Sequence, residues 1–320
     1  MSASHPLKVA VLMGGPSGEH DISLRSGRGV LEALLRRQWV AEPVVIPQAA
    51  TIEEACEYAR RVVQRIGPDV AFIALHGPFG EDGTIQQLCD ELHVAYTGST
   101  AATSRLGMDK AASKKRFEEA GLRVPRGQTI NLDKPDRRGL RLAYPLVVKP
   151  VGQGSSLGVS IVRHENQLPE ALVEAGQYGN RLLLEEFIPG RELTVGVFGE
   201  DALPIVEVRP SHPFFDYATK YTAGMTDYLV PAPLPAEIAA AVQAAGLKAH
   251  RALGCRHLSR TDLILNADNV PVILEVNTIP GFTPTSLLPK AAACVNLSYD
   301  ELCEQLALMA WQGVAQTTSH

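Results

Sequence analysis

The sequence predicts two kinds of fold in one chain: a doubly wound parallel α/β unit at the amino terminus, and α+β structure in the remainder. Over about residues 1–105, apolar runs of strand length alternate with stretches of helical spacing, the pattern of a parallel sheet covered by helices. Beyond Tyr144, apolar runs follow at short intervals and are joined by turn residues, which favours antiparallel pairing. With 320 residues, the chain is long enough for two or three domains.

The amino-terminal unit begins with "LKVAVLM" (7–13), an uninterrupted apolar run that predicts a buried strand ending at Gly14-Gly15. The alternation continues with helices expected at 24–37, 51–66 and 84–92, and strands at 43–47, 69–77 and 95–99. Ligands of such sheets bind at the carboxyl ends of the strands. Two glycine-rich segments, "GGPSGEHD" (14–21) and "HGPFGEDGT" (76–84), occupy these positions.

The rest of the chain starts with a basic helix over 108–121, followed by closely spaced strands at 144–150, 158–163, 181–188, 192–198 and 203–208. Residues 210–235 have no regular period, and a loop of this length is usually functional. The expected order then ends with a helix (236–254), two strands around an Asn-Ala-Asp-Asn turn (257–265 and 270–278) and an amphipathic helix (298–313). We predict three domains, over residues 1–107, 108–190 and 191–320.

Composition and charge argue against several classes of function. Hydrophobic residues make up 45% and charged residues 20% of the chain, which is ordinary for a soluble globular protein. A net charge of −5 offers no basic surface for nucleic acid, and no apolar run approaches the roughly 18 residues of a membrane helix. The five cysteines form no C-x-x-C pair, and the amino terminus lacks the basic region of a signal peptide. We therefore expect a cytoplasmic protein with reduced thiols.

Polar side chains interrupt the two apolar strands near the carboxyl end. Alternation places Arg260 with Asp262 on one strand, and Glu275 with Asn277 on its neighbour, with each pair sharing a face. Two carboxylates and an amide in an apolar setting would repel each other without a cation between them, and oxygen ligands suit Mg²⁺ beside phosphates. Solvent-facing polar residues on half-buried strands are the alternative, and the spacing alone leaves both open.

Two further segments have the residue types of a nucleotide site. In "KPVGQGSSLGVS" (149–160), Lys149 ends a buried strand, and the glycines and serines after it can aim backbone N–H groups at an anion. The lysine precedes the glycines, unlike in a Walker loop, and a flexible hairpin loop is the alternative. In "LLLEEFIPGRE" (182–192), a carboxylate could contact adenine or ribose, or the acids could simply protect an edge strand from aggregation.

The order of these motifs resembles that of the ATP-grasp ligases. Together with the two amino-terminal segments, "MDK", "VVKPVGQGSSLG", "EEFIPGRE", "KYT", "SRTD" and "LEVNTIPGFT" are similar to the D-alanine–D-alanine ligase family over about residues 7–310. The resemblance implies an ATP-grasp fold behind an amino-terminal substrate-binding domain (1–107). The central subdomain (108–190) would carry a glycine-serine flap over ATP. The carboxyl-terminal subdomain (191–320) would carry the metal site and a long mobile loop.

The same resemblance assigns residues to the nucleotide and its metals. Lys110 and Lys149 match lysines at the ATP phosphates, and Lys220 matches one near the γ-phosphate. The positions around adenine and ribose are matched by Glu185, Ile188 and Glu192, and the ligands of two Mg²⁺ (or Mn²⁺) by Asp262, Glu275 and Asn277. Gln153 stands where many relatives have glutamate, which puts the details of flap closure in doubt.

Substrate positions carry over in the same way. Glu19 matches the acid that binds the ammonium of the first D-alanine, linked by hydrogen bonds to Ser155 and Tyr221, and His76 lies near that substrate. Arg260 and the N–H of Gly281 match groups around the reacting carboxyl, and Ser286 and Leu287 match positions at the carboxylate of the second D-alanine. Taken singly, Glu19 could be a helix-terminal acid, His76 a turn histidine and Tyr221 a surface aromatic.

The family implies ATP-dependent ligation of two D-alanines through an acyl phosphate, releasing ADP and phosphate, for peptidoglycan precursors, by a homodimer. Other ATP-grasp ligases, such as a D-alanine–D-lactate or glutathione-type synthetase, are one alternative. Tyr221 after Lys220 and the amino-terminal motifs argue against them. A regulatory nucleotide-binding protein with an inactive site is another alternative, and the intact set around Asp262 argues against it.

Overall fold

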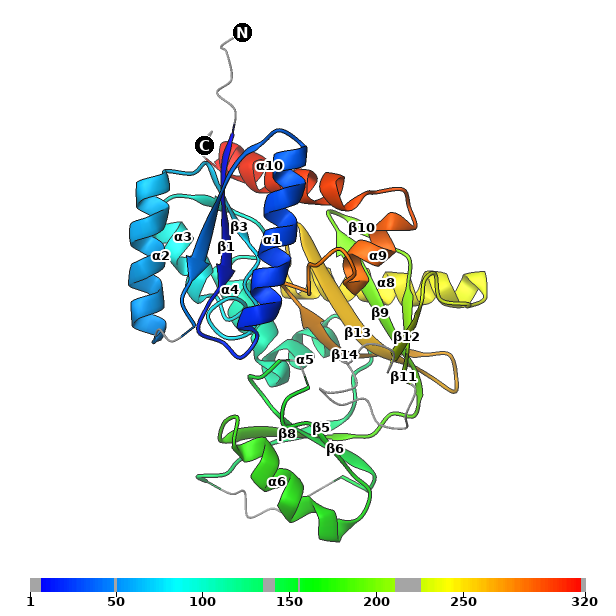
Figure 1. Cartoon of the computed structure of the whole chain (residues 1–320). Coiled ribbons are helices and arrows are strands. Elements are labelled where there is room, and N and C mark those ends of the chain that lie inside the picture. Colours follow the sequence, from blue (N-terminus) through cyan, green and yellow to red (C-terminus); the bar gives the residue numbers. More distant parts are fainter. Residues whose placement is uncertain (1–6, 49–50, 135–141, 155, 211–225, 318–320) are drawn as a thin grey trace.

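The computed structural model describes residues 7–48, 51–134, 142–154, 156–210 and 226–317 (Figure 1). Within these ranges the strands form three sheets, one parallel and two antiparallel. The predicted combination of α/β and α+β structure is therefore confirmed. Of the predicted site, Ser155, Lys220 and Tyr221 lie outside the described residues. Among the described helices, none has the length and apolar character needed to cross a membrane.

The amino-terminal sheet is parallel and has the strand order β2-β1-β3-β4, where β1 is Lys8–Gly14, β2 Val40–Ile46, β3 Val70–Ile73 and β4 Ala95–Tyr96. From the central β1 the chain moves first to one side, to β2, and then to the other, to β3. This reversal opens a crevice at the carboxyl ends of β1 and β3. The two glycine-rich segments selected from the sequence start there.

Helices cover both faces of this sheet, because alternate residues of β1 point to opposite sides. Val9, Val11 and Met13 pack with α1 (His20–Arg36) and α10 (Tyr299–Thr317). Ala10 and Leu12 pack with α2 (Ile52–Ile66) and α3 (Thr84–Glu91). The predicted doubly wound arrangement is therefore confirmed.

The central sheet has the antiparallel order β5-β8-β6-β7, where β5 is Gly127–Asn131, β6 Leu146–Pro150, β7 Ser160–Val162 and β8 Arg181–Glu186. A 3₁₀ turn (Glu165–Gln167) leads into α6 (Leu168–Gly176). This helix packs Ala171 and Ala175 against Leu146 and Val148. Figure 1 shows this sheet and α6 at one end of the molecule, with the loop between β6 and β7 directed toward the other two sheets.

The third sheet is antiparallel, with the order β12-β11-β9-β13-β14 and the short β10 (Asp201–Ala202) beside β9. Its other strands are β9 Gly190–Phe198, β11 Val206–Pro210, β12 Thr226–Leu229, β13 Leu258–Asn266 and β14 Pro271–Asn277. Helix α8 (Ala236–Leu253) covers one face. It approaches β9 closely at Gly246, where an added Cβ would lie 2.6 Å from the Cβ of Val195.

One expected loop is partly wrong. The sequence of residues 210–235 predicted irregular structure, but Thr226–Leu229 forms β12 and pairs with β11, Val208 opposite Tyr228. A four-residue strand is too short to show a period, and its pairing depends on β11, which is distant in sequence. The structure does not describe residues 211–225 of this predicted loop.

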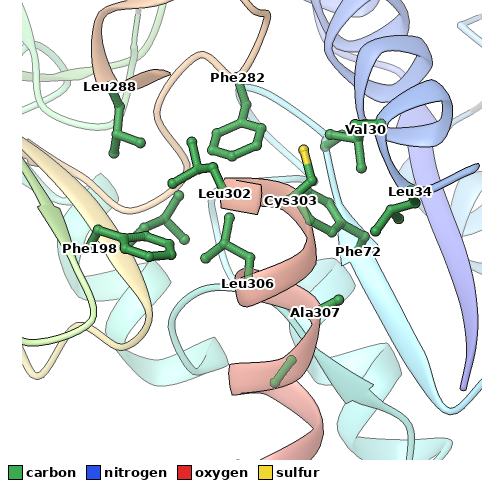
Figure 2. Close-up of a cluster of buried hydrophobic side chains, with 14 of the residues drawn as sticks. Val30, Leu34, Phe72, Phe198, Phe282, Leu288, Leu302, Cys303, Leu306 and Ala307 are labelled. Carbon is green, nitrogen blue, oxygen red and sulfur yellow. The ribbon is translucent and has the colours of Figure 1, made fainter. Parts of the chain in front are cut away.

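Two helices pack across the predicted domain boundaries. After α4 (Ala101–Met108), α5 (Lys110–Glu119) places Phe117 among the residues of the third sheet and α8. Helix α10 inserts Leu302 and Leu306 into a core that joins Phe72 of the amino-terminal sheet with Phe198 of the third sheet (Figure 2). The boundaries near 107 and 190 remain predictions.

Candidate active site

Two cavities meet where the three sheets come together. The larger, of about 500 Å³, lies between the amino-terminal loops, the third sheet and α9 (Leu287–Ala293), and the smaller, of about 210 Å³, lies between the central and third sheets. Both are lined by Gly154, Glu192, Asp262 and Glu275, so they form one continuous site. Its position at the carboxyl ends of β1 and β3 agrees with the rule for open α/β sheets.

The structure brings together every predicted site residue that it describes. The larger cavity is lined by Glu19, His76, Glu192, Arg260, Asp262, Glu275, Asn277, Gly281, Ser286 and Leu287. The smaller cavity is lined by Lys110, Lys149, Glu185, Ile188, Glu192, Asp262 and Glu275. Their individual roles remain predictions, since lining a cavity does not define what a residue binds there.

A buried cluster of three charges lies at the smaller cavity. Lys149 is the next-to-last residue of β6 and Glu185 lies on the neighbouring β8. Their side chains meet on the same face, with Nζ and Oε2 2.6 Å apart. On the other side, Lys114 of α5 places its Nζ 2.6 Å from Oε1 of the same carboxylate. The Glu185 side chain is only 2% exposed. One buried carboxylate is therefore shared by two buried lysines.

Burial and the neighbouring charges change the pKa values in this cluster. Burial, and secondly the charge of Lys149, lower the pKa of Lys114 to about 8. Burial alone would raise the pKa of Glu185, but the two ammonium groups outweigh it and hold that pKa below its usual value. Glu185 is therefore ionised at neutral pH, and the cluster has an excess of positive charge.

The sequence did not single out Lys114, although a signal was present. It lies four residues after Lys110 in a predicted helix, and residues at this spacing share a helix face. Lys110 itself donates a hydrogen bond from Nζ to the carbonyl oxygen of Gln153 (2.7 Å) and pairs with Oε2 of Glu275 (3.1 Å). Helix α5 thus contributes Lys110 to the lining of the smaller cavity and Lys114 to the buried cluster around Glu185.

The carboxyl-terminal polar residues lie on paired strands as predicted. In the antiparallel ladder of β13 and β14, Asp262 is opposite Glu275 and Arg260 opposite Asn277, and the register shifts directly after Asp262. Two hydrogen bonds of 2.8 Å join the guanidinium of Arg260 to the carboxylate of Asp262. The side-chain nitrogen of Asn277 also donates to Asp262 (3.0 Å). The set is fixed in position before any ligand binds.

The donor set is compatible with divalent metal only together with a ligand. Among the residues that the structure describes, no group of three or more His, Cys, Asp and Glu could hold an ion by itself. Asp262 and Glu275 supply hard oxygen atoms at the junction of the two cavities, and Asn277 adds one in the larger cavity. Mg²⁺ is commonly bound by one or two carboxylates plus substrate phosphates. These residues therefore fit a metal that arrives with a nucleotide.

At the opposite wall of the larger cavity, Glu19 lies directly before α1. Gly77 adopts a positive φ of 70°, and a Cβ there would lie 2.9 Å from Oε2 of Glu19. A Cβ on Gly154 would lie 3.9 Å from the same oxygen. The carboxylate therefore lies between the turn after β3 and the loop after β6. The hydroxyl of Ser17 fixes that turn by donating to the carbonyl oxygen of His76 (2.7 Å).

His76 is buried, with a hydrogen-bond partner at one ring nitrogen and an acidic side chain near the other. Its Nε2 lies 3.0 Å from the hydroxyl of Ser26 on α1, and its Nδ1 lies 3.7 Å from Oε1 of Glu81. Only 3% of its side chain is exposed, although it lines the cavity. These contacts fix the ring toward the site, in contrast to an ordinary turn histidine.

The loop after β14 completes the site. Ser286 immediately precedes α9, and its hydroxyl accepts a hydrogen bond from the N–H of Thr283 (3.0 Å) and lies 2.8 Å from the hydroxyl of the same residue. A Cβ on Gly281 would lie 3.4 Å from this hydroxyl, so the loop turns closely upon itself. The backbone of Gly281 and the start of α9 therefore face the same cavity as Arg260.

Comparison with known proteins identifies the family. Residues 48–99 match the family model described as the D-Ala-D-Ala ligase N-terminus, and residues 123–308 match the corresponding C-terminus. The D-alanine–D-alanine ligase of Syntrophotalea carbinolica is 44% identical over 305 residues, covering 93% of this chain and 94% of that protein. The ligase of Geotalea uraniireducens is 41% identical over 310 residues and covers 97% of each chain.

Solved structures agree with these sequence relatives. The D-alanine–D-alanine ligase of Bacillus anthracis, solved in complex with ATP, superposes with a TM-score of 0.83 at 29% identity, covering 97% of this chain and 99% of that one. A second structure of that ligase gives a TM-score of 0.86 at 31% identity, with the same coverage. Two family models match the chain, relatives are 41% and 44% identical to it over nearly its whole length, and it shares the ATP-grasp fold. The chain therefore belongs to the D-alanine–D-alanine ligase family.

Proposed function

We propose that the protein joins two D-alanines into D-alanyl-D-alanine, with conversion of ATP to ADP and phosphate, for peptidoglycan precursor synthesis. The observation that carries the proposal is the continuity of the two cavities at Glu192, Asp262 and Glu275. One cavity has buried lysines suited to phosphates, and the other has acids and cations suited to amino acids. A phosphoryl group bound at their junction would reach a carboxylate held next to it. The family membership supports this assignment.

The smaller cavity suits ATP in both its charge and its apolar walls. Apolar side chains of the central and third sheets line it and could enclose a purine: Val147, Val159, Ile161, Phe187, Ile264 and Leu274. Glu185, Ile188 and Glu192 would contact the adenine and ribose. Lys110 and Lys149 would contact the phosphates, joined by Lys220, which lies outside the described residues. Arranged in this way, the triphosphate would point toward the larger cavity.

Asp262, Glu275 and Asn277 would hold two Mg²⁺ (or Mn²⁺) with the bound nucleotide. Such ions would neutralise phosphate charge during phosphoryl transfer. In this structure Arg260 and Lys110 already neutralise the carboxylates of Asp262 and Glu275. These two side chains therefore hold the carboxylates in a fixed orientation for binding.

The larger cavity would hold the two amino acids. Glu19 would bind the ammonium of the first D-alanine, with Ser155 and Tyr221 as its partners and His76 beside it. Phosphorylation of the first carboxylate gives an acyl phosphate. The neutral amine of the second D-alanine then attacks its carbonyl carbon, the bond to the phosphate oxygen breaks, and phosphate leaves. Arg260 and the N–H of Gly281 would stabilise the oxyanion formed on the way.

The acyl phosphate would hydrolyse if water reached it, so the site must be closed during the reaction. The loop after β6 contains Gly154, which lines both cavities and lies near Glu19. That loop is thus placed to cover ATP and to contact the first substrate together. The pathway implies a cytoplasmic location, and the family implies a homodimer, which light scattering of the purified protein would test.

The decisive experiment measures phosphate release and dipeptide formation with ATP and Mg²⁺, with and without D-alanine. We expect phosphate release to depend on D-alanine and to match the dipeptide formed mole for mole. The variant Lys248→Met, at an exposed position on α8 outside both cavities, controls for the effects of substitution itself. Phosphate release at the same rate with and without D-alanine, or phosphate release without dipeptide formation, would contradict the proposal.

A further inference from the structure

Among the residues that the structure describes, the larger cavity is lined by more acidic than basic side chains, although its proposed substrates bear carboxylates. Its described lining contains five acids, Glu19, Glu81, Glu192, Asp262 and Glu275, and three bases, Arg25, Arg260 and Lys290. An amino-acid carboxylate placed among these acids would be repelled unless a cation stood next to it. The carboxylate of the attacking amino acid remains an anion throughout the reaction, so its binding requires such a cation.

Of the three bases, Lys290 is the one available on the side of α9. Arg260 is bound by both oxygens of Asp262. Arg25 is exposed and lies on α1, the helix that begins directly after Glu19, rather than on α9. Lys290 is half-buried, and within the described part of the chain no carboxylate forms an ion pair with its Nζ. Its charge is therefore not neutralised by the protein there.

An aromatic ring holds the Lys290 ammonium at the cavity wall. Its Nζ lies 4.8 Å from the centre of the Tyr228 ring, which is within cation–π distance, and both residues line the larger cavity. Tyr228 comes from β12 and Lys290 from α9, so the contact joins two sides of the cavity. Lys290 also lies one helical turn after Ser286, the residue directly before α9, and its backbone N–H donates to the carbonyl oxygen of Ser286 (3.0 Å).

We infer that Lys290, held on the ring of Tyr228, binds the carboxylate of the acceptor amino acid and so selects acceptors that have a free carboxylate. This inference rests on the proposed ligase function, because an acceptor exists only if an acyl phosphate is formed. Ser286 and Leu287 lie on the same side and would contact the same group. Lys290 contributes the full positive charge that a hydroxyl and a backbone N–H lack.

The test is a competition between D-alanine and D-alaninamide in one reaction. D-Alaninamide has no carboxylate to activate, so it can react only as the acceptor and gives D-alanyl-D-alaninamide. The ratio of the two products, separated by chromatography, reports acceptor choice and is unaffected by the amount of folded enzyme. The different amine basicities of the two acceptors affect every variant equally and cancel in the comparison.

In Lys290→Met, which keeps the length of the side chain and removes its charge, we expect the ratio of dipeptide to amide product to fall about tenfold, equivalent to about 1.4 kcal/mol. Lys290→Arg should recover most of the preference, and Tyr228→Leu should lose part of it. Lys248→Met should leave the ratio unchanged. An unchanged ratio in Lys290→Met would overturn the inference. A wild-type enzyme that makes neither product would overturn the proposed function instead.

Discussion

Replacing Glu185 by glutamine should destabilise this protein far more than a conservative substitution usually does. Glu185, Lys114 and Lys149 are all at least nine-tenths buried, and each carboxylate oxygen lies 2.6 Å from one ammonium nitrogen. Glutamine preserves the shape of the side chain but removes the charge that both lysines share. Two buried ammonium groups would remain without a counter-charge, since burial separates them from water.

The expected loss in the free energy of unfolding depends on the burial of the three side chains, and its pH dependence depends on the pKa of Lys114. Removing one partner of a buried ion pair typically costs about 3–5 kcal/mol, and we expect a loss in this range in the free energy of unfolding at pH 7. The pKa of Lys114 is about 8 even beside Glu185. Without the carboxylate it must fall further, so the lysine loses its proton in the native variant at a pH where the wild type keeps it.

The deficit of the Glu185→Gln variant relative to the wild type should shrink as the pH rises from 7 to 8. Between pH 7 and 8 the native variant binds fewer protons at Lys114 than the native wild type, while the unfolded chains bind equal numbers. Stability therefore rises more steeply with pH in the variant, by up to about 1.4 kcal/mol per pH unit for this lysine. This advantage ends near pH 8, where the wild-type lysine also loses its proton.

Urea unfolding followed by circular dichroism at pH 7 and pH 8, without nucleotide, measures both quantities. The matched control is Glu186→Gln, the next residue of β8, whose carboxylate pairs with the exposed Arg126 at 2.8 Å. Such a surface pair contributes about 0–1 kcal/mol, so the control should lose little. A Glu185→Gln variant no less stable than this control, or one whose deficit grows from pH 7 to 8, would refute the reasoning.

Three further predictions test the site itself. Asp262→Asn should abolish phosphate release in a coupled assay while thermal unfolding stays cooperative, and normal Mg²⁺-dependent turnover would exclude Asp262 as a ligand. Gly77→Ala, with φ at 70° and a Cβ 2.9 Å from Glu19, should lower kcat/KM for D-alanine about tenfold and leave KM for ATP unchanged, since the strain of about 1–2 kcal/mol lies at the substrate end. With equal D-alanine and D-lactate at about pH 7.5, near the α-amino pKa range, chromatography should show mostly D-alanyl-D-alanine, decreasing at lower pH as the amine is protonated; mostly D-alanyl-D-lactate would refute the choice of amine over hydroxyl.

The sequence predicted those parts of the fold whose cause is local. The uninterrupted apolar run of β1 required burial on both faces, and both faces of the amino-terminal sheet are covered. The alternation of Arg260 with Asp262 and of Glu275 with Asn277 fixed which side chains share a face once β13 and β14 pair. Glycine-rich segments at strand ends indicated where a ligand enters. Each of these signals is contained within about ten residues.

The sequence did not predict which helices and strands pack against each other when they are distant in the chain. The spacing of α10 shows that it has an apolar face, but not that Leu302 and Leu306 join two sheets (Figure 2). The pairing of β12 with β11 likewise depends on residues outside the short strand itself. An amphipathic pattern shows which face of a helix is buried, but it does not identify the surface against which that face packs.

The neighbouring lysines 114 and 115 show the same limit at the site. Lys115 is exposed, whereas Lys114 is buried, because Phe117 packs on the third sheet and so fixes the rotation of α5. Residues 114 and 117 are three apart and share that inward face, while residue 115 points about 100° away. The Lys114–Glu185 pair then joins α5, held by the third sheet, to β8 of the central sheet. A movement of the central sheet relative to α5 must therefore carry this buried pair with it or leave its charges uncompensated, which ties the nucleotide cavity to the position of α5.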